Sequence, residues 1–482
     1  MQTSKSNLIK PSRFIKDTFI YGLDSIFAQL IALFVIPFYT KVLSTEEYGI
    51  LAMATLGMNF ITPLLSLGLD NGFFRYFSLS NNNEEKIELT TTVYILKIVP
   101  LLLFFLIFKY MYSFFNDTVF NGLLTYNNFI IILLITIINN IYNSAQVIIR
   151  ASRKPKVLVI INVILAPIVT ILSMYLVVIL KYGVNGALIS MLVGNFFKAI
   201  ILNIYIKDYL SLKYFLNGKV KPLITYSLPY IPHRIQSGLM NLLPLFIINQ
   251  KLGLEVAGIY AVAVKLSKPI NLVVSMVWKS FIPHKFSIHK EDSKPERNFR
   301  VLIVNYWYLI IFLCYCAALI SPYMYKLIID EKFHFGISYF PFILLMPLSQ
   351  AFYSTVSTGV EIGKSQKILP IASFLGLLVQ LFLSIYSLKF LNIYGPIISF
   401  AIATSVSGLI NYFYTKRFFY IDYPFLNVLF FFSILSIFIK INYHINNLLA
   451  SAIFFALGFY ILIMVILKFN NTSLKKLIQN YK

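Results

Sequence analysis

Cysteine, tryptophan and acidic residues are scarce in this chain. Its 482 residues include 2 cysteines and 2 tryptophans, and 18 acidic residues stand against 41 basic ones. Cys314 and Cys316 lie in one apolar run, and we interpret them as core-facing or lipid-facing thiols rather than as a disulfide or a metal site. The sequence therefore predicts no metal site and no cofactor.

Charge is also scarce, and no long polar segment interrupts the chain. Charged residues make up 12% and hydrophobic residues 59%, whereas soluble domains are about a quarter charged. The most polar loops are 70–90, 207–221 and 279–299, and each is too short to bury a core of its own. A soluble catalytic or binding domain is therefore excluded, so any site must be built from membrane helices and loop edges.

Long apolar runs fill most of the sequence. A membrane-spanning helix needs ~20 mostly apolar residues, and these runs lack the period-two alternation of a membrane β-barrel. The fold class that we predict is an all-α integral membrane protein with about 14 transmembrane helices. The expected spans are 17–39, 48–69, 91–113, 125–149, 157–180, 183–206, 224–249, 256–278, 300–320, 336–358, 369–389, 393–414, 424–441 and 446–467.

The net charge of +23 comes mainly from short loops between these runs. With the N-terminus in the cytoplasm, the cytoplasmic segments with the adjoining span ends hold 28 Lys and Arg residues, and the outer loops with the adjoining span ends hold 8. Such a bias is typical of cytoplasmic loops in helical membrane proteins. We therefore predict a multi-pass membrane protein with both termini in the cytoplasm. Nucleic acid is excluded as a partner, because no folded hydrophilic region could read it.

The sequence repeats itself weakly at a nearly constant offset. GILAMA at 49–54 resembles GIYAVA at 258–263, and GALIS at 186–190 resembles GPIIS at 395–399, both 209 positions later. This pattern predicts an N-terminal six-helix bundle (1–206), a cytoplasmic linker (207–222), a C-terminal six-helix bundle (223–415) and two additional helices with a basic tail (416–482). Parallel repeats of this kind are typical of transporters that bind substrate between two rocking halves.

Six charged residues lie well inside the predicted spans, away from the span ends, where a charge usually faces a cavity or a partner. They are Asp24, Lys97, Lys198, Arg234, Lys265 and Lys268. Five of the six are cations, so the interior favours an anionic ligand, with phosphate as the natural candidate. Arg150, at the end of the fourth span, is a further candidate for this cationic cavity. Snorkelling of Lys97 and Lys198 and a purely topological role for Arg150 stay open as alternatives.

Two of these features give more specific expectations. Lys265 and Lys268 lie one turn apart on one helical face, where they repel each other unless an anion or water lies between them. Asp24 and Asp70 are the candidates for ion coupling, because burial can bring a carboxyl group into a usable titration range. Salt bridges are the alternative for both acids, and for Asp70 we expect Arg75 as the partner.

Four local sequences resemble bacterial polysaccharide repeat-unit flippases, which belong to the superfamily that includes multidrug extruders and lipid II flippases. TKVLSTEEYG at 40–49 is similar to the turn after the family's first helix, and SLGLDNGFFRYF at 66–77 to the end of its second. YSLPYIP at 226–232 and GLEVAGIYAVA at 253–263 resemble its seventh helix and the turn that follows. One departure is the stretch NLLPLF at 241–246, which lacks the Asp-Arg pair of many relatives.

The resemblance implies a flippase for an undecaprenyl-diphosphate-linked oligosaccharide, a repeat unit of O-antigen, lipopolysaccharide, capsule or exopolysaccharide. Such a protein moves its anionic lipid-linked substrate across the inner membrane by alternating access and is not an enzyme. Membrane lipid, a polysaccharide polymerase and a chain-length regulator are the other implied partners. A multidrug extrusion transporter is the first alternative, and a membrane-embedded polymerase or glycosyltransferase is the second.

Overall fold

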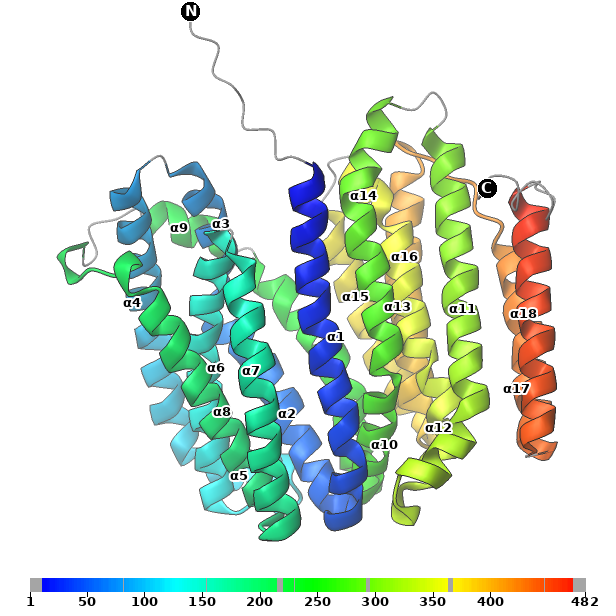
Figure 1. Ribbon diagram of the computed structural model, residues 1–482, viewed down its shortest axis with the longest axis horizontal. Helices are drawn as coiled ribbons and strands as arrows, with labels where there is room; N and C mark the ends of the chain where they lie inside the picture. The colour runs from blue at the N-terminus through cyan, green and yellow to red at the C-terminus, as the bar shows by residue number, and fades with distance from the viewer. Residues whose placement is uncertain are drawn as a thin grey trace, which may run out of the picture. The chain divides into compact units, whose positions relative to one another are not determined.

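The structure is a computed structural model of the chain, and it describes residues 11–80, 82–152, 154–214, 220–228, 230–291, 295–362, 367–445 and 447–470. These residues form helices joined by short turns, and no β-strand occurs among them (Figure 1). The predicted all-α membrane fold is therefore confirmed.

The helices agree with the expected number of membrane spans. Among the described residues, 11 helices are long and apolar enough to cross a membrane. One of them, Tyr230–Trp278, contains 49 residues and is interrupted at Gly253, where φ is 87° and ψ is 169°. Dividing it there adds one span, and Ile26–Val42 is a shorter apolar helix. The remaining predicted span, 336–358, is occupied by two shorter helices that end and begin around residue 344.

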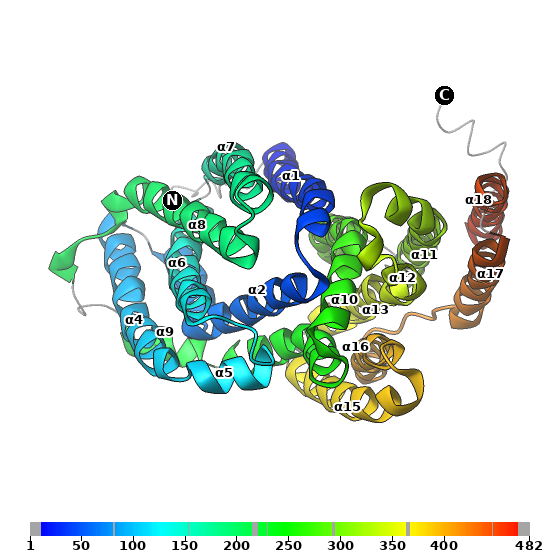
Figure 2. The same ribbon diagram turned by 90° about the horizontal axis from the view of Figure 1, so that it is seen from below.

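The chain forms two compact units, of which the first contains Met1–Gly238. Its helices are α1 (Pro11–Val42), α2 (Thr45–Leu65), α3 (Leu69–Leu79), α4 (Asn83–Tyr110), α5 (Tyr112–Val119), α6 (Tyr126–Ala151), α7 (Pro155–Met174), α8 (Gly183–Tyr205), α9 (Val220–Ser227) and the first part of α10 (Tyr230–Glu291). Within this unit α6 lies against α8, and α1 lies against α7 (Figure 2).

The second unit contains Leu239–Lys482. After the remainder of α10 it comprises α11 (Pro295–Ile328), α12 (Gly336–Ile343), α13 (Leu345–Val356), α14 (Thr358–Ile362), α15 (Ile368–Leu391), α16 (Tyr394–Thr415), α17 (Phe425–Ile445) and α18 (Leu448–Asn470). α15 packs closely on α16 because small residues face each other there: a Cβ on Gly376 would overlap Ser407. Small residues let helices approach in the membrane, where water supplies no driving force.

Polar residues at the helix starts explain where several spans begin. Ser44 accepts a hydrogen bond from the Glu47 amide, and the Glu47 side chain accepts one from the Ser44 amide. This capping box satisfies two amides that the first turn of a helix leaves unpaired. Asn82 and Thr125 cap α4 and α6 in the same manner. The motif at 40–49 therefore marks the turn from α1 to α2.

Apolar side chains around α3 form a buried core in the first unit. The residues of this core come from α3, α4, α6, α7, α8 and α9, and include Phe73, Val93, Ile148 and Leu223. The core continues along the short helix α3, which does not belong to the spans. The packing of this core holds the polar start of α3 beside α4, α6 and α9.

Candidate functional site

The chain turns sharply between α2 and α3, and glycine allows the turn. Gly68 precedes α3 with a φ of +67°, a conformation that side chains other than glycine rarely adopt. A Cβ on Gly68 would lie 2.5 Å from the Ser227 carbonyl oxygen, and one on Gly72 would overlap the Ser227 hydroxyl. α9 can therefore lie directly on α3, and Asp70 and Asn71 are held in the first turn of α3.

Asp70 lies at the centre of a charged cluster in the first unit. Lys97 of α4 donates to Asp70 Oδ1 at 2.7 Å and to Ser144 Oγ of α6 at 2.8 Å. Arg234 of α10 is 3.7 Å from Asp70 Oδ2 and donates to Asn71 Oδ1 at 3.3 Å. We call these five residues the Asp70 cluster. It joins α3, α4, α6 and α10.

The cluster continues through a buried polar chain toward α2. Ser144 donates to the carbonyl oxygen of Asn140, and the Asn140 amide donates to the carbonyl oxygen of Thr62 at 3.0 Å. These contacts fix the Ser144 hydroxyl as an acceptor for Lys97. A buried charge requires such support, because burial without partners costs several kcal/mol.

The two cations of the cluster differ in exposure. The Lys97 side chain is 4% exposed and that of Arg234 is 27% exposed. The cluster holds two positive charges and one negative charge, so one positive charge is in excess. A guanidinium has five N–H donors in a planar fork suited to phosphate and carboxylate. Arg234, which is the more accessible cation and has the longer contact to Asp70, can therefore accept a second anion.

The expected pairing of Asp70 with Arg75 is wrong. Residues five positions apart on a helix point about 140° away from each other, so the two side chains leave α3 in different directions. The Arg75 guanidinium lies 4.5 Å from the centre of the Tyr226 ring, while Asp70 turns toward Lys97.

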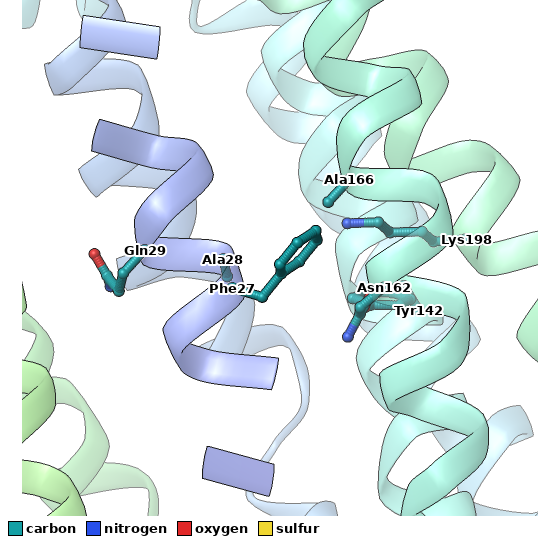
Figure 3. Close-up of a pocket in the computed structure, with 7 residues that line it drawn as sticks. All are labelled: Phe27, Ala28, Gln29, Tyr142, Asn162, Ala166 and Lys198. Carbon is teal, nitrogen blue, oxygen red and sulfur yellow. The ribbon is translucent and has the colours of Figure 1, made fainter. Parts of the chain in front are cut away.

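The structure places the two remaining candidate cations of the first unit, Lys198 and Arg150, outside this cluster. Lys198 of α8 lines a cavity of about 370 Å³ together with residues of α1, α6 and α7 (Figure 3). Arg150 is exposed at the end of α6, where it donates to Gln146 Oε1 at 3.0 Å. Lys97, Asp70 and Arg234 are thus brought together, whereas Lys198 belongs to a second site and Arg150 to the surface.

Lys265 and Lys268 lie in the second unit, on the part of α10 that follows Gly253. Lys265 is half-buried and Lys268 is exposed, one helical turn apart as their spacing predicts. Asp24 falls in α1, but its side chain lies outside the described residues. Among the residues that the structure describes, no group of His, Cys, Asp and Glu is arranged to hold a metal ion.

Several polar and aromatic residues of these two sites were not predicted from the sequence. Asn71 and Ser144 complete the Asp70 cluster, and Tyr142 and Asn162 line the cavity beside Lys198. The available signal was their position: Ser144, Tyr142 and Asn162 are polar groups within apolar spans. Uncharged groups of this kind are frequent, and only the contacts distinguish these three.

Solved structures of membrane transporters share this fold. An inward-facing multidrug resistance MATE family transporter of the MOP superfamily superposes with a TM-score of 0.63 at 13% identity, covering 81% of this chain and 94% of its own. The lipid II flippase MurJ in an inward closed conformation superposes with a TM-score of 0.61 at 16% identity, and the match covers 95% of this chain and 100% of MurJ. A MOP superfamily transporter from Pyrococcus furiosus superposes with a TM-score of 0.55 at 13% identity, and the match covers 83% of this chain and 95% of that transporter.

The chain therefore shares the fold of these transporters and is a multi-pass membrane protein. The sequence profile of the family described as polysaccharide biosynthesis protein matches residues 14–289, more than half of the chain. The chain belongs to this family, as its resemblance to polysaccharide repeat-unit flippases predicted. A search of curated proteins finds no significant match.

Proposed function

We propose that the protein is a flippase for an undecaprenyl-diphosphate-linked oligosaccharide. It would move the repeat unit of a surface polysaccharide from the cytoplasmic face to the outer face of a bacterial inner membrane. The family and the transporter fold support this proposal, and the observation that carries it is the excess positive charge of the Asp70 cluster. A polysaccharide carrier lipid presents a diphosphate, which needs cationic groups at the point where it crosses the membrane.

The geometry of the cluster suggests how the diphosphate would bind. The Lys97–Asp70 contact is short and buried, whereas the Arg234–Asp70 contact is longer and more exposed. An arriving diphosphate can therefore compete with Asp70 for Arg234 and leave the Lys97–Asp70 pair intact. Binding would release α10 from α3 at this contact, which links substrate binding to a movement of the first part of α10.

The wider mechanism is proposed from the predicted organisation. Two six-helix halves (1–206 and 223–415) would rock to expose the site alternately to each face, with the termini in the cytoplasm. Lys265, Lys268 and Lys198 would contribute further positive charge along the path. Coupling to an ion gradient is proposed to use Asp24 or Asp70.

A deletion strain tests the function directly. We expect complete lipid-linked repeat units to accumulate on the cytoplasmic face, and the intact gene to restore export. An Arg234→Ala variant should lose export at a normal protein level, whereas Arg150→Ala, on an exposed arginine outside the cluster, should retain it. Single repeat units that reach the outer face without being polymerised would instead indicate a polymerase.

The similarity to the MATE transporter supports multidrug extrusion as the second candidate. Its assay is the efflux of a cationic dye from cells that express the protein. Efflux that persists in Arg234→Ala, with normal surface polysaccharide in the deletion strain, would favour extrusion over the flippase.

A further inference from the structure

The cavity beside Lys198 lies within the first unit, apart from the Asp70 cluster. Its volume of about 370 Å³ is near the lower end of the ~300–1,000 Å³ typical of small-molecule pockets. α1 contributes Phe27, α6 contributes Tyr142, α7 contributes Asn162 and α8 contributes Lys198 (Figure 3). All four residues are half-buried.

The side chains converge on this cavity from opposite sides. Figure 3 shows the Phe27 ring directed from α1 toward α7 and α8, and the Lys198 ammonium directed back toward α1. Lys198 Nζ lies 6.0 Å from the centre of the Tyr142 ring. The lysine thus points into the cavity beside two aromatic rings, which argues against an extended snorkelling conformation along α8.

A hydrogen bond orients the polar groups on the other wall. The Tyr142 hydroxyl donates to Asn162 Oδ1 at 3.1 Å. This contact directs the oxygen of the Asn162 amide toward Tyr142, so that the NH₂ group, a donor, points away from it. Asn162 and Ala166 lie four residues apart on α7, so they share one face. The wall therefore presents a small apolar patch next to an amide donor.

These groups match the chemistry of an acidic sugar. The C–H face of a pyranose ring packs on aromatic rings, because its weakly positive hydrogens meet the negative π face. An amide and a phenol exchange hydrogen bonds with ring hydroxyls. One ammonium is suited to one carboxylate, whereas a phosphate is usually held by arginine forks or by a helix N-terminus.

We propose that this cavity binds a sugar ring bearing a carboxylate, as a subsite for the transported repeat unit. Lys198 would pair with the carboxylate, Phe27 and Tyr142 would stack on the ring, and Asn162 would hydrogen-bond to a hydroxyl. The assignment of the sugar to a transported repeat unit rests on the proposed flippase function. The subsite would select among repeat units by their charge.

Protection of an introduced thiol tests the site in the purified full-length protein. Ala166→Cys places a thiol in the cavity wall, and its modification by a small methanethiosulfonate reagent is followed by peptide mass spectrometry. The native Cys314 and Cys316 lie in α11 of the second unit, and their peptides are measured separately. The probes are methyl glucuronoside, methyl glucoside, inorganic phosphate and glycerol 1-phosphate.

We expect methyl glucuronoside to slow the modification of residue 166 and methyl glucoside to do so only at much higher concentration. Adding Lys198→Gln should raise about tenfold the concentration of methyl glucuronoside needed for protection, as expected for the loss of one charge-assisted hydrogen bond. Lys198→Arg in its place should restore part of the protection. Phe27→Ala should weaken the protection given by both methyl glucuronoside and methyl glucoside. The control is Lys109→Gln, which changes an exposed lysine at the end of α4. It should leave the protection by both sugars unchanged.

Three results would overturn the proposal. Equal protection by the two sugars would remove the role of Lys198, and stronger protection by phosphate or glycerol 1-phosphate would assign the cavity to a phosphate group. Protection by no probe would reject the site. Flipping of lipid-linked oligosaccharide is measured separately in proteoliposomes: flipping without protection rejects only the subsite, and protection without flipping rejects the flippase function.

Discussion

Replacement of Asp70 and replacement of Arg234 should affect the protein in different ways. Asp70→Ala leaves the Lys97 ammonium, which is 4% exposed, with the Ser144 hydroxyl as its remaining partner in the cluster. Removing one partner of a buried ion pair costs ~3–5 kcal/mol. Arg234→Gln breaks a contact of 3.7 Å to a side chain that is 27% exposed, which costs ~0.2–1 kcal/mol.

The difference should be measurable in purified, detergent-solubilised protein. With ~2 °C per kcal/mol for a large chain, we expect Asp70→Ala to lower the apparent Tm by about 6–10 °C, and Arg234→Gln to lower it by about 2 °C or less. The double variant Asp70→Leu/Lys97→Met removes both charges and should recover most of the loss. Export of lipid-linked repeat units, measured in parallel, should fail in Arg234→Gln although that protein is nearly as stable as the wild type.

Three outcomes would contradict these roles of Asp70 and Arg234. A wild-type Tm for Asp70→Ala would show that the Lys97–Asp70 pair does not stabilise the fold. If Arg234→Gln lowered the apparent Tm as much as Asp70→Ala does, Arg234 would be a structural residue. A double variant that is less stable than Asp70→Ala would contradict the argument from an unpaired buried charge.

Three further predictions concern other parts of the chain. Replacing Lys265 and Lys268 together by Ala should abolish surface polysaccharide at a normal protein level, and normal polysaccharide would exclude both from the path. Gly72→Ala should reduce expression and Tm because its Cβ would overlap Ser227, whereas Gly57→Ala, with no atom near its Cβ, should be neutral or stabilising by up to ~1 kcal/mol. Tyr315→Phe removes the hydrogen bond to the Phe454 carbonyl oxygen at 2.7 Å and should lower the unfolding free energy by ~0.5–1.5 kcal/mol, as a Tm comparison would show.

Much of the fold was predictable because the membrane imposes a local rule. Each span must satisfy its own backbone hydrogen bonds and remain apolar over ~20 residues, so the spans appear in the sequence one at a time. The kink at Gly253 and the capped start of α2 were marked by the short motifs at 253–263 and 40–49. The short helix α3 was not predicted, because its residues resemble the loop that continues from α2.

The sites were predictable only in part. Composition and position indicated that Lys97, Lys198 and Arg234 needed partners, because a charge in the membrane is costly without one. They did not show which partner each one has: the spacing from Asp70 to Arg75 suggested a pair, but the geometry of a helix separates them. Tyr142 and Asn162 had no distinguishing mark before the structure placed them beside Lys198.

The sequence by itself determined that this is a helical membrane protein with a cationic interior, because hydrophobicity and charge are properties of each segment. Only the tertiary structure decided that Asp70 lies between Lys97 and Arg234, and that Lys198 faces a separate cavity with two aromatic rings. These pairings depend on how α3, α4, α6, α8 and α10 pack, including the glycine contacts that seat α9 on α3. Packing of distant segments is not encoded in any one of them.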